Sequence, residues 1–271
     1  MAYQIIVLDL DGTLTNSQKE ITPKTKERLM QIQEEGKTVV LASGRPTPGV
    51  QPLADELKLQ EYGGYILSFN GAKIINCRTR EVVYNKTVPM EYLPMLYDYA
   101  VKKNLGILSY TDTDIILGNG TNEYTKLEAK INHLPMQEIE NFVEYIDFPE
   151  NKFLMTGDPE LIFGAQKELR QQFGERLNIF RSEPFFLEIM PPRVDKAYSL
   201  GKLLEFLERD KADMICCGDG FNDLSMIQFA GLGVAMANAQ KEVKEAADFI
   251  TYSNDEDGVA HVVEKFMLEM E

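Results

Sequence analysis

The chain has 271 residues, enough for one large α/β domain or two ordinary domains with a sizeable core. Hydrophobic residues make up 44% and charged residues 26%, fractions typical of globular proteins, which excludes a disordered or fibrous chain. The 28 basic and 43 acidic residues give a net charge of −15, which is unfavourable for binding nucleic acid or an anionic membrane surface. An anionic small ligand would therefore need a cation or a local group of backbone N–H donors.

The cysteines and the opening residues indicate the compartment. Cys77, Cys216 and Cys217 are an odd set without a CxxC pair, so we expect neither a disulfide framework nor a zinc site. The opening residues MAYQIIVLDLDG have no basic segment, so we do not expect a signal peptide. No run approaches the ~20 apolar residues of a membrane span. We expect a soluble cytoplasmic protein.

The first 70 residues alternate between apolar runs and helical patterns. Strands are predicted at 3–8, 38–42 and 65–69, with helices at 23–35 and up to about 59. Thr22 and Pro23 form the expected start of the first helix, as N-cap and first helical residue. This β-α-β-α-β order is typical of a doubly wound parallel sheet.

The middle of the chain has a different pattern. From about residue 73 to 191, short strand-like runs alternate with helical stretches near 90–103 and 160–173, and several runs are separated by few turn residues, which favours antiparallel hairpins. The α/β pattern resumes at Asp195, with helices predicted at 196–209, 224–230 and 240–247 and strands at 214–217, 233–236 and 249–251. We therefore predict a Rossmann-like α/β core formed by residues 1–76 and 193–271, with an α+β domain inserted at 77–192.

Polar residues follow several predicted strands of the core. They are Asp9 and Asp11 after the first strand, Ser43 after the second, Asp219 and Asp223 after a later one, and Lys196 from a helix start. The carboxyl ends of parallel strands meet at one edge, where ligands bind, so these side chains should converge. Converging carboxylates need a cation, and an all-oxygen set favours Mg²⁺. Neither histidine, His133 nor His261, follows a strand, which argues against a Ser-His-Asp or zinc hydrolase.

These motifs, in this order and spacing, resemble the haloacid dehalogenase superfamily of phosphatases. The resemblance is carried by Asp9-Leu10-Asp11-Gly12-Thr13-Leu14, Ser43-Gly44-Arg45, Lys196 and Gly218-Asp219-Gly220-Phe221-Asn222-Asp223. The position and length of the insertion resemble the Cof-like, subclass IIB members, in which it forms an α+β cap domain. One departure is Ala197, where the family pattern often has glycine after the motif lysine.

The resemblance implies a role for each motif residue. Asp9 would be the nucleophile and would form an aspartyl phosphate, while Asp11 would act as general acid and then base. Lys196 would neutralise charge in the transition state. The expected phosphate-binding residues are Gly12, Ser43, Gly44, Lys196 and Asn222. The expected metal ligands are Asp9, Asp219, Asp223 and the backbone carbonyl of Asp11.

Three further residues are candidates for substrate contacts. Arg45 is either a cation at the mouth of the site or the partner of one of the carboxylates. Asn70 closes the third strand and is either a substrate contact or a hinge residue. Glu188 alternates with apolar neighbours, so it faces either the substrate or solvent.

The function predicted from these residues is Mg²⁺-dependent hydrolysis of small phosphorylated metabolites, with sugar phosphates as the substrate class that the resemblance implies. Two alternatives remain open: a sugar-phosphate mutase, and a phosphosugar-binding regulator without turnover. The Asp9 and Asp11 pair argues against the regulator, because a binder needs no acid two residues after a nucleophile. The sequence leaves the preferred substrate and the oligomeric state open.

Overall fold

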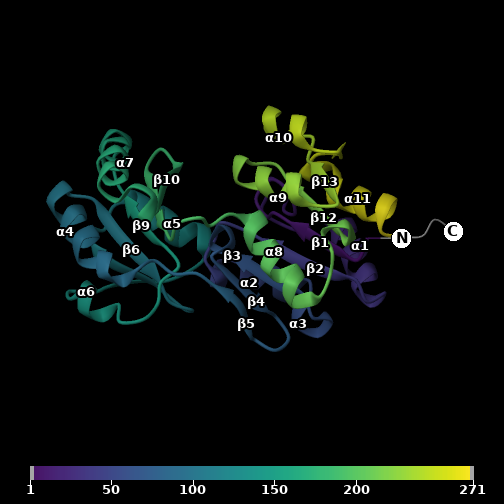
Figure 1. Ribbon diagram of the computed structural model, residues 1–271, viewed down its shortest axis with the longest axis horizontal. Coiled ribbons are helices and arrows are strands. Elements are labelled where there is room, and N and C mark those ends of the chain that lie inside the picture. The colour runs from purple at the N-terminus through teal and green to yellow at the C-terminus, as the bar shows by residue number, and fades with distance from the viewer. Residues whose placement is uncertain (1–2, 269–271) are drawn as a thin grey trace. The chain divides into compact units, whose positions relative to one another are not determined.

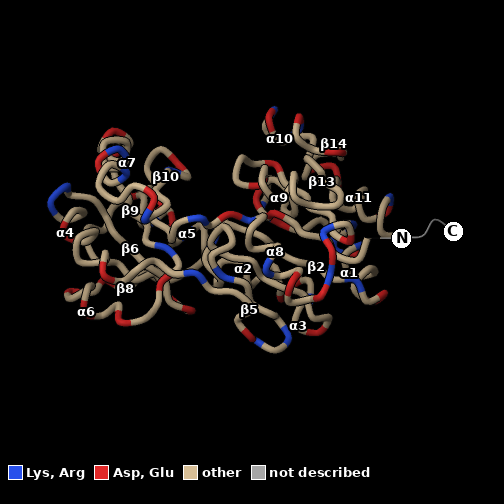
Figure 2. Tube along the Cα trace, viewed as in Figure 1, with Lys and Arg blue, Asp and Glu red and all other residues tan. Residues whose placement is uncertain are grey.

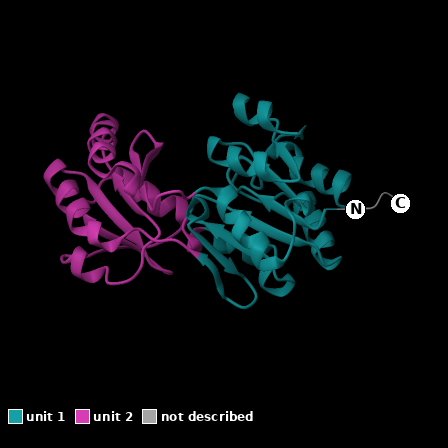
Figure 3. Cartoon of the chain, viewed as in Figure 1, with its two compact units in different colours: residues 1–45, 50–84, 195–271 teal, residues 46–49, 85–194 magenta. Residues whose placement is uncertain are grey.

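The computed structural model describes residues 3–268, which form two compact units (Figure 3). The first unit takes in the chain up to Arg45, Val50–Tyr84 and the chain from Asp195, and the second takes in Pro46–Gly49 and Asn85–Val194. The sequence places the first long boundary after residue 76, whereas the structure places it after residue 84. The boundary shifts because a short strand in this stretch, β5 (Val82–Asn85), belongs to the sheet of the first unit.

The first unit is built on an eight-stranded sheet of order β14-β13-β12-β1-β2-β3-β4-β5 (Figure 1). The strands from β14 to β3 pair in parallel, and β3 pairs with β4 in the antiparallel sense. The strands are β1 (Ile5–Leu8), β2 (Thr38–Ala42), β3 (Tyr65–Ser68), β4 (Lys73–Asn76), β5 (Val82–Asn85), β12 (Met214–Gly218), β13 (Leu232–Ala235) and β14 (Phe249–Ile250). Because β1 lies between β2 and the much later β12, the strand order reverses at β1.

Both faces of this sheet are buried. Along β1, Ile6 and Leu8 join one apolar cluster while Ile5 and Val7 join another, as the two-residue period of a strand requires. Helices α1 and α11 contribute to the first cluster, and α8 contributes to the second. The helices are α1 (Pro23–Glu34), α2 (Thr47–Glu56), α3 (Leu59–Tyr62), α8 (Lys196–Leu207), α9 (Leu224–Phe229), α10 (Lys241–Ala246) and α11 (Gly258–Phe266). This confirms the doubly wound α/β core.

The second unit holds a six-stranded sheet of order β10-β11-β9-β6-β7-β8, in which all neighbours pair antiparallel except β7 and β8. Its strands are β6 (Gly106–Tyr110), β7 (Ile115–Asn119), β8 (Met136–Glu138), β9 (Phe153–Thr156), β10 (Asn178–Glu183) and β11 (Phe186–Met190). Its helices are α4 (Leu93–Lys103), α5 (Glu123–Asn132), α6 (Phe142–Tyr145) and α7 (Pro159–Phe173). The α+β character predicted for the insertion is therefore present.

Four elements of the structure have no counterpart among those predicted from the sequence: α5, β8, α6 and α11. In α5 the cause is physical: the helix buries Thr125, Glu128 and Asn132, so it lacks the apolar period that marks an amphipathic helix. In α11, Val259, Val262 and Val263 do follow a helical period and give a usable signal.

Charged residues of both signs are spread along both units, so the net charge is not the property of one segment (Figure 2). Within residues 3–268, no helix has both the length and the apolar character needed to cross a membrane.

Candidate active site

Three carboxylates meet at the carboxyl edge of the parallel sheet. Asp9 directly follows β1, Asp219 directly follows β12, and Asp223 ends the short helical turn that comes next. Each offers an oxygen within 4.8 Å of the others. Asp9 and Asp223 are buried and Asp219 is half-buried. The convergence predicted from the strand ends is thus present for these three residues.

Lys196 is the ammonium partner of this cluster. It is the first residue of α8, whose N-cap is the side chain of Asp195, and it is fully buried. Its Nζ lies 2.7 Å from Asp9 Oδ1 and 2.6 Å from Asp223 Oδ1, and it donates to the carbonyl of Ala42 at 2.8 Å. The alanine at position 197 does not prevent this placement.

The Asp223 carboxylate also holds the loop after β12. Its Oδ2 accepts hydrogen bonds from the backbone N–H groups of Asp219 at 3.0 Å and Gly220 at 2.9 Å. Because Asp219 and Asp223 are four residues apart, the backbone of the loop can turn so that its N–H groups reach the Asp223 carboxylate. Asp219 is fixed from another side, because the Thr13 hydroxyl donates to its Oδ1 at 2.8 Å.

The carboxylates are held in an electrostatically costly arrangement. Burial raises the pKa of Asp9 to about 8, with Asp223 adding to the rise and Lys196 opposing it. Burial likewise raises the pKa of Asp219 to about 6, and the charge of Asp223 contributes. For Lys196, burial acts to lower the pKa, but the charges of Asp223 and Asp9 outweigh it, so the net pKa lies above the usual value. The ammonium therefore stays charged.

These residues fit a magnesium ion. Two of the three carboxylates pair with the one ammonium, which leaves negative charge uncompensated, and the ligand atoms are all hard oxygens. Gly12 leaves room beside Asp219: a Cβ built on Gly12 would lie 2.5 Å from Asp219 Oδ2, and its φ of +91° disfavours other residues. A residue with a side chain at position 12 would press on the carboxylate.

The predicted phosphate-binding residues lie around the same strand ends. Ser43 directly follows β2, is buried, and its Oγ accepts from the N–H of Arg45 at 3.1 Å. Asn222 is exposed and donates through Nδ2 to Asn70 Oδ1 at 3.3 Å. Gly44 packs against Asn70 so closely that an added Cβ would lie 3.1 Å from its Oδ1. Asn70 therefore contacts one predicted phosphate-binding residue and crowds another.

The corner around Asn70 is unusual. Phe69 and Asn70 both have left-handed backbone angles, with φ of 51° and 52°, and Gly71 follows with φ of 101°. Such a conformation costs energy in non-glycine residues and persists only where its surroundings hold it. Here the Gly71 carbonyl accepts from the hydroxyl of Ser199 in α8 at 2.6 Å. Of the two interpretations of Asn70, the contact to Asn222 supports a place in the site.

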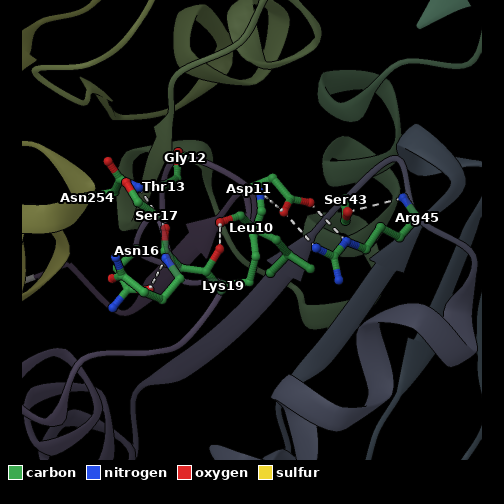
Figure 4. A network of polar contacts seen from close by, with 12 residues as sticks. Leu10, Asp11, Gly12, Thr13, Asn16, Ser17, Lys19, Ser43, Arg45 and Asn254 are labelled. Atoms are coloured by element: carbon green, nitrogen blue, oxygen red, sulfur yellow. Dashed lines mark hydrogen bonds and ion pairs between the residues drawn. The ribbon is translucent and has the colours of Figure 1, made fainter. Parts of the chain in front are cut away.

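Arg45 pairs with a carboxylate, which was one of its two predicted roles. Its Nε and Nη2 lie 2.9 and 2.6 Å from the two oxygens of Asp11 (Figure 4). Lys19 approaches the same carboxylate, with Nζ 2.8 Å from Asp11 Oδ1. Burial acts to raise the pKa of Asp11, but the hydrogen bonds and charges of Arg45 and Lys19 outweigh it, so that the net pKa lies below the usual value. Asp11 therefore has its own cations.

Glu188 belongs to the second unit and does not face solvent, so the solvent-facing alternative is wrong. The side chain is buried, with Oε2 3.0 Å from Lys152 Nζ and Oε1 accepting from the Ser182 hydroxyl at 2.9 Å. Lys152 precedes β9, which pairs with β11, and a buried cation there gives no signal in the sequence.

Lys19, Thr13 and Asn238 contact residues of the site without having been predicted to do so. Lys19 is an exposed lysine in a loop, so composition and spacing give no signal for it. Thr13 was visible as part of the first motif. Asn238 donates through Nδ2 to the carbonyl of Gly12 at 2.8 Å, and only the fold brings these two residues together.

Comparison with known proteins identifies the family of this chain. The model of the haloacid dehalogenase-like hydrolase family matches residues 6–263. The Bacillus subtilis protein named "Putative phosphatase YxeH" is 35% identical over 269 residues, covering 98% of this chain and 99% of that protein. The Bacillus subtilis 5-amino-6-(5-phospho-D-ribitylamino)uracil phosphatase YcsE is 29% identical over 273 residues, covering 98% of this chain and 96% of that protein.

Solved structures of the same superfamily share this fold. A haloacid dehalogenase-like hydrolase from Bacteroides thetaiotaomicron is 49% identical, with a TM-score of 0.94 over 97% of this chain and 99% of that one. A subclass IIB sugar phosphatase of the same superfamily shares the fold at 24% identity, with a TM-score of 0.80 over 97% and 98% of the two chains. Fold and site together define a hydrolase with a doubly wound, Rossmann-like core. The chain belongs to the haloacid dehalogenase-like hydrolase family, and it is a phosphatase.

Proposed function

We propose that the protein is a magnesium-dependent phosphatase for small phosphorylated metabolites, with sugar phosphates as its substrate class, acting through a phosphoryl group on Asp9. The observation that carries the proposal is the buried contact of Asp9 with Lys196, beside Asp219 and Asp223. A carboxylate held against a lysine at a sheet edge is suited to attack a phosphorus atom, because the ammonium limits repulsion between the two anions.

The proposed reaction has two steps. An oxygen of Asp9 attacks phosphorus, the bond from phosphorus to the ester oxygen breaks, and Asp11 gives a proton to the departing alkoxide. Asp11 then takes a proton from a water molecule, which attacks phosphorus and breaks its bond to Asp9. Inorganic phosphate leaves, the Asp9 carboxylate is restored and Asp11 is protonated again.

The remaining core residues bind the phosphoryl group in this proposal. The Lys196 ammonium, the Ser43 hydroxyl and the Asn222 amide would contact the phosphoryl oxygens, and Gly12 and Gly44 would let backbone N–H groups approach them. The metal would be held by Asp9, Asp219, Asp223 and the backbone carbonyl of Asp11. When bound, magnesium supplies positive charge that offsets the repulsion between nucleophile and substrate.

Selectivity among substrates is assigned to the second unit in this proposal, with Asn70 of the first unit as a further candidate. Glu188 is the candidate in the second unit, because its carboxylate oxygens can accept hydrogen bonds from the hydroxyl groups of a sugar. Its ion pair with Lys152 would then orient it.

The direct test is phosphate release from a panel of sugar phosphates with and without Mg²⁺, with Asp9→Asn as the control for contaminating phosphatases. The proposal expects metal-dependent phosphate release by the wild-type chain and none by the variant. Formation of an isomeric sugar phosphate without free phosphate would instead show a mutase. Binding without any turnover would show a regulator.

A further inference from the structure

The carboxylate of Asp11 is held by two cations, Arg45 and Lys19. The planar guanidinium of Arg45 contacts both oxygens, at 2.9 and 2.6 Å, and Lys19 Nζ adds a third contact at 2.8 Å (Figure 4). A two-point contact of this kind fixes the plane of a carboxylate, which a single point charge cannot do.

The two carboxylate oxygens of Asp11 accept different numbers of hydrogen bonds from these cations. Oδ1 accepts from both Lys19 and Arg45, whereas Oδ2 accepts from Arg45 Nε alone among the described residues. Each carboxylate oxygen has about two lone-pair positions. Oδ2 therefore keeps a position at which it can hold a proton, and Oδ1 does not.

Arg45 is itself held in place. Its N–H donates to Ser43 Oγ at 3.1 Å, and its carbonyl accepts from the N–H of Phe69 at 3.0 Å. Its side chain is mostly buried. The guanidinium therefore approaches Asp11 from a fixed backbone.

The loop that carries Lys19 is also held. Asn16 Oδ1 accepts from the N–H groups of Gln18 and Glu20, both at 3.0 Å. Ser17 donates through its N–H and its hydroxyl to the carboxylate of Asp255, at 2.8 and 2.6 Å. Lys19 has a left-handed backbone, with φ of 65°, which this turn stabilises. Arg45 and Lys19 thus lie on two segments that are held by separate hydrogen bonds, and each places its cation against the Asp11 carboxylate.

We infer that Arg45 and Lys19 are positioning residues that orient the Asp11 carboxylate for proton transfer, and that they do not bind the phosphoryl group. The inference rests on the proposed function, since it presumes that Asp11 moves a proton. The cations of the site then have different roles, because Lys196 contacts Asp9, whereas Arg45 and Lys19 contact Asp11.

The test uses p-nitrophenyl phosphate, whose leaving group departs without a proton. The first release of p-nitrophenolate then needs no acid, while hydrolysis of the phosphoenzyme still needs Asp11 as base. We expect Arg45→Ala to keep the rate of the first turnover within ~3-fold while steady-state turnover falls by ~100-fold, the usual cost of a misplaced reacting group. Stopped-flow absorbance should therefore show a burst in the variant. With a sugar phosphate, both steps should slow.

Further variants make the test specific. Lys19→Ala should also keep the rate of the first turnover, with a smaller loss of steady-state turnover than Arg45→Ala. Lys19→Arg should keep most of the wild-type steady-state turnover, because Lys19 acts through its positive charge. In an Asp11→Asn background, Arg45→Ala should cost less than ~2-fold more, since residues that act through one group are not additive. Lys26→Ala, which removes an exposed ion pair with Glu56, is the control. Thermal unfolding should be unchanged within ~2 °C for the Lys19 variants, because the side chain of Lys19 is exposed. The side chain of Arg45 is mostly buried, so Arg45→Ala is assayed at a temperature at which circular dichroism shows the variant folded.

Other outcomes would overturn the inference. If Arg45→Ala slows the first release of p-nitrophenolate, or raises the substrate concentration for half-maximal burst, Arg45 binds the phosphoryl group. If its effect persists in full beside Asp11→Asn, it does not act through Asp11. Failure of the proposed function looks different, because the wild-type chain would then release no phosphate at all.

Discussion

Lys196 and Asp9 form an ion pair inside the first unit, with 2.7 Å between Nζ and Oδ1, although 187 residues separate them in the chain. One partner comes from each half of the split core, so the contact joins the two halves at the end of β1. Because the lysine is fully buried and also contacts Asp223, both carboxylates depend on it for charge compensation.

Replacing Lys196 by methionine tests that dependence. We expect Lys196→Met to lower the free energy of unfolding by about 3–5 kcal/mol, because breaking a buried ion pair leaves charge without a partner. Turnover should be lost as well. The control is Lys202→Met on the same helix, an exposed lysine paired with Glu205, which should change stability by less than ~0.5 kcal/mol. Urea unfolding without metal measures the stability of both variants. If Lys196→Met were as stable as Lys202→Met, the result would contradict the account.

The two aspartates Asp11 and Asp219 should fail in different ways. Asp11→Asn should lower kcat by ~100-fold or more with little change in Mg²⁺ affinity, because proton transfer is lost and only the backbone of Asp11 is assigned to the metal. Asp219→Asn should mainly weaken Mg²⁺ binding. Titrating activity against Mg²⁺ separates the two effects, and interchanged behaviour would show that the roles are wrongly assigned.

Gly12→Ala tests the close approach to Asp219. The added Cβ would lie 2.5 Å from Asp219 Oδ2, so the carboxylate must move, and we expect Mg²⁺ affinity to fall ~10-fold or more, as when a supporting contact of a metal ligand is lost. Gly36→Ala is the matched control, since Gly36 has a φ of +84° with nothing within 4 Å of its Cβ. Both variants should lose ~1 kcal/mol of stability from the left-handed backbone. Calorimetric Mg²⁺ binding should change only for Gly12→Ala; an equal or absent change in both would contradict this account.

Glu188→Gln tests the selectivity assigned to the second unit. We expect kcat/KM to change by ~10-fold or more for some sugar phosphates, because an amide replaces one hydrogen-bond acceptor of the carboxylate. Turnover of p-nitrophenyl phosphate should stay within ~2-fold, as expected for a change outside the phosphoryl-binding groups. A uniform loss over all substrates, together with a lower melting temperature, would show that Glu188 serves only its buried pair with Lys152.

Residues that follow strands could be predicted from sequence because the local pattern fixes their position. Asp9, Ser43 and Asp219 come directly after apolar runs, and parallel strands end at one edge of a sheet. Lys196 could be predicted for a related reason, as the first residue of a helix with an N-cap. Their convergence follows from topology alone.

Residues that depend on long-range packing could not be predicted in this way. Lys19 reaches Asp11 from a loop in which Ser17 is tied to Asp255, a contact across 238 residues that leaves no pattern. The Glu188 pair was hidden because Lys152 follows the polar residues Glu150 and Asn151, where a solvated lysine is the ordinary expectation. The α5 helix was missed because its buried face is polar.

The central claim, attack by Asp9 on phosphorus, is tested most directly by trapping the intermediate. Wild-type protein with Mg²⁺ is mixed with radiolabelled sugar phosphate, quenched in acid during turnover and digested, and the labelled peptide is identified by mass spectrometry. The account predicts phosphate on the peptide that contains Asp9, released by base or hydroxylamine as an acyl phosphate is, and no label in Asp9→Asn. Label on another residue, or wild-type turnover by a verified Asp9→Asn sample, would contradict it.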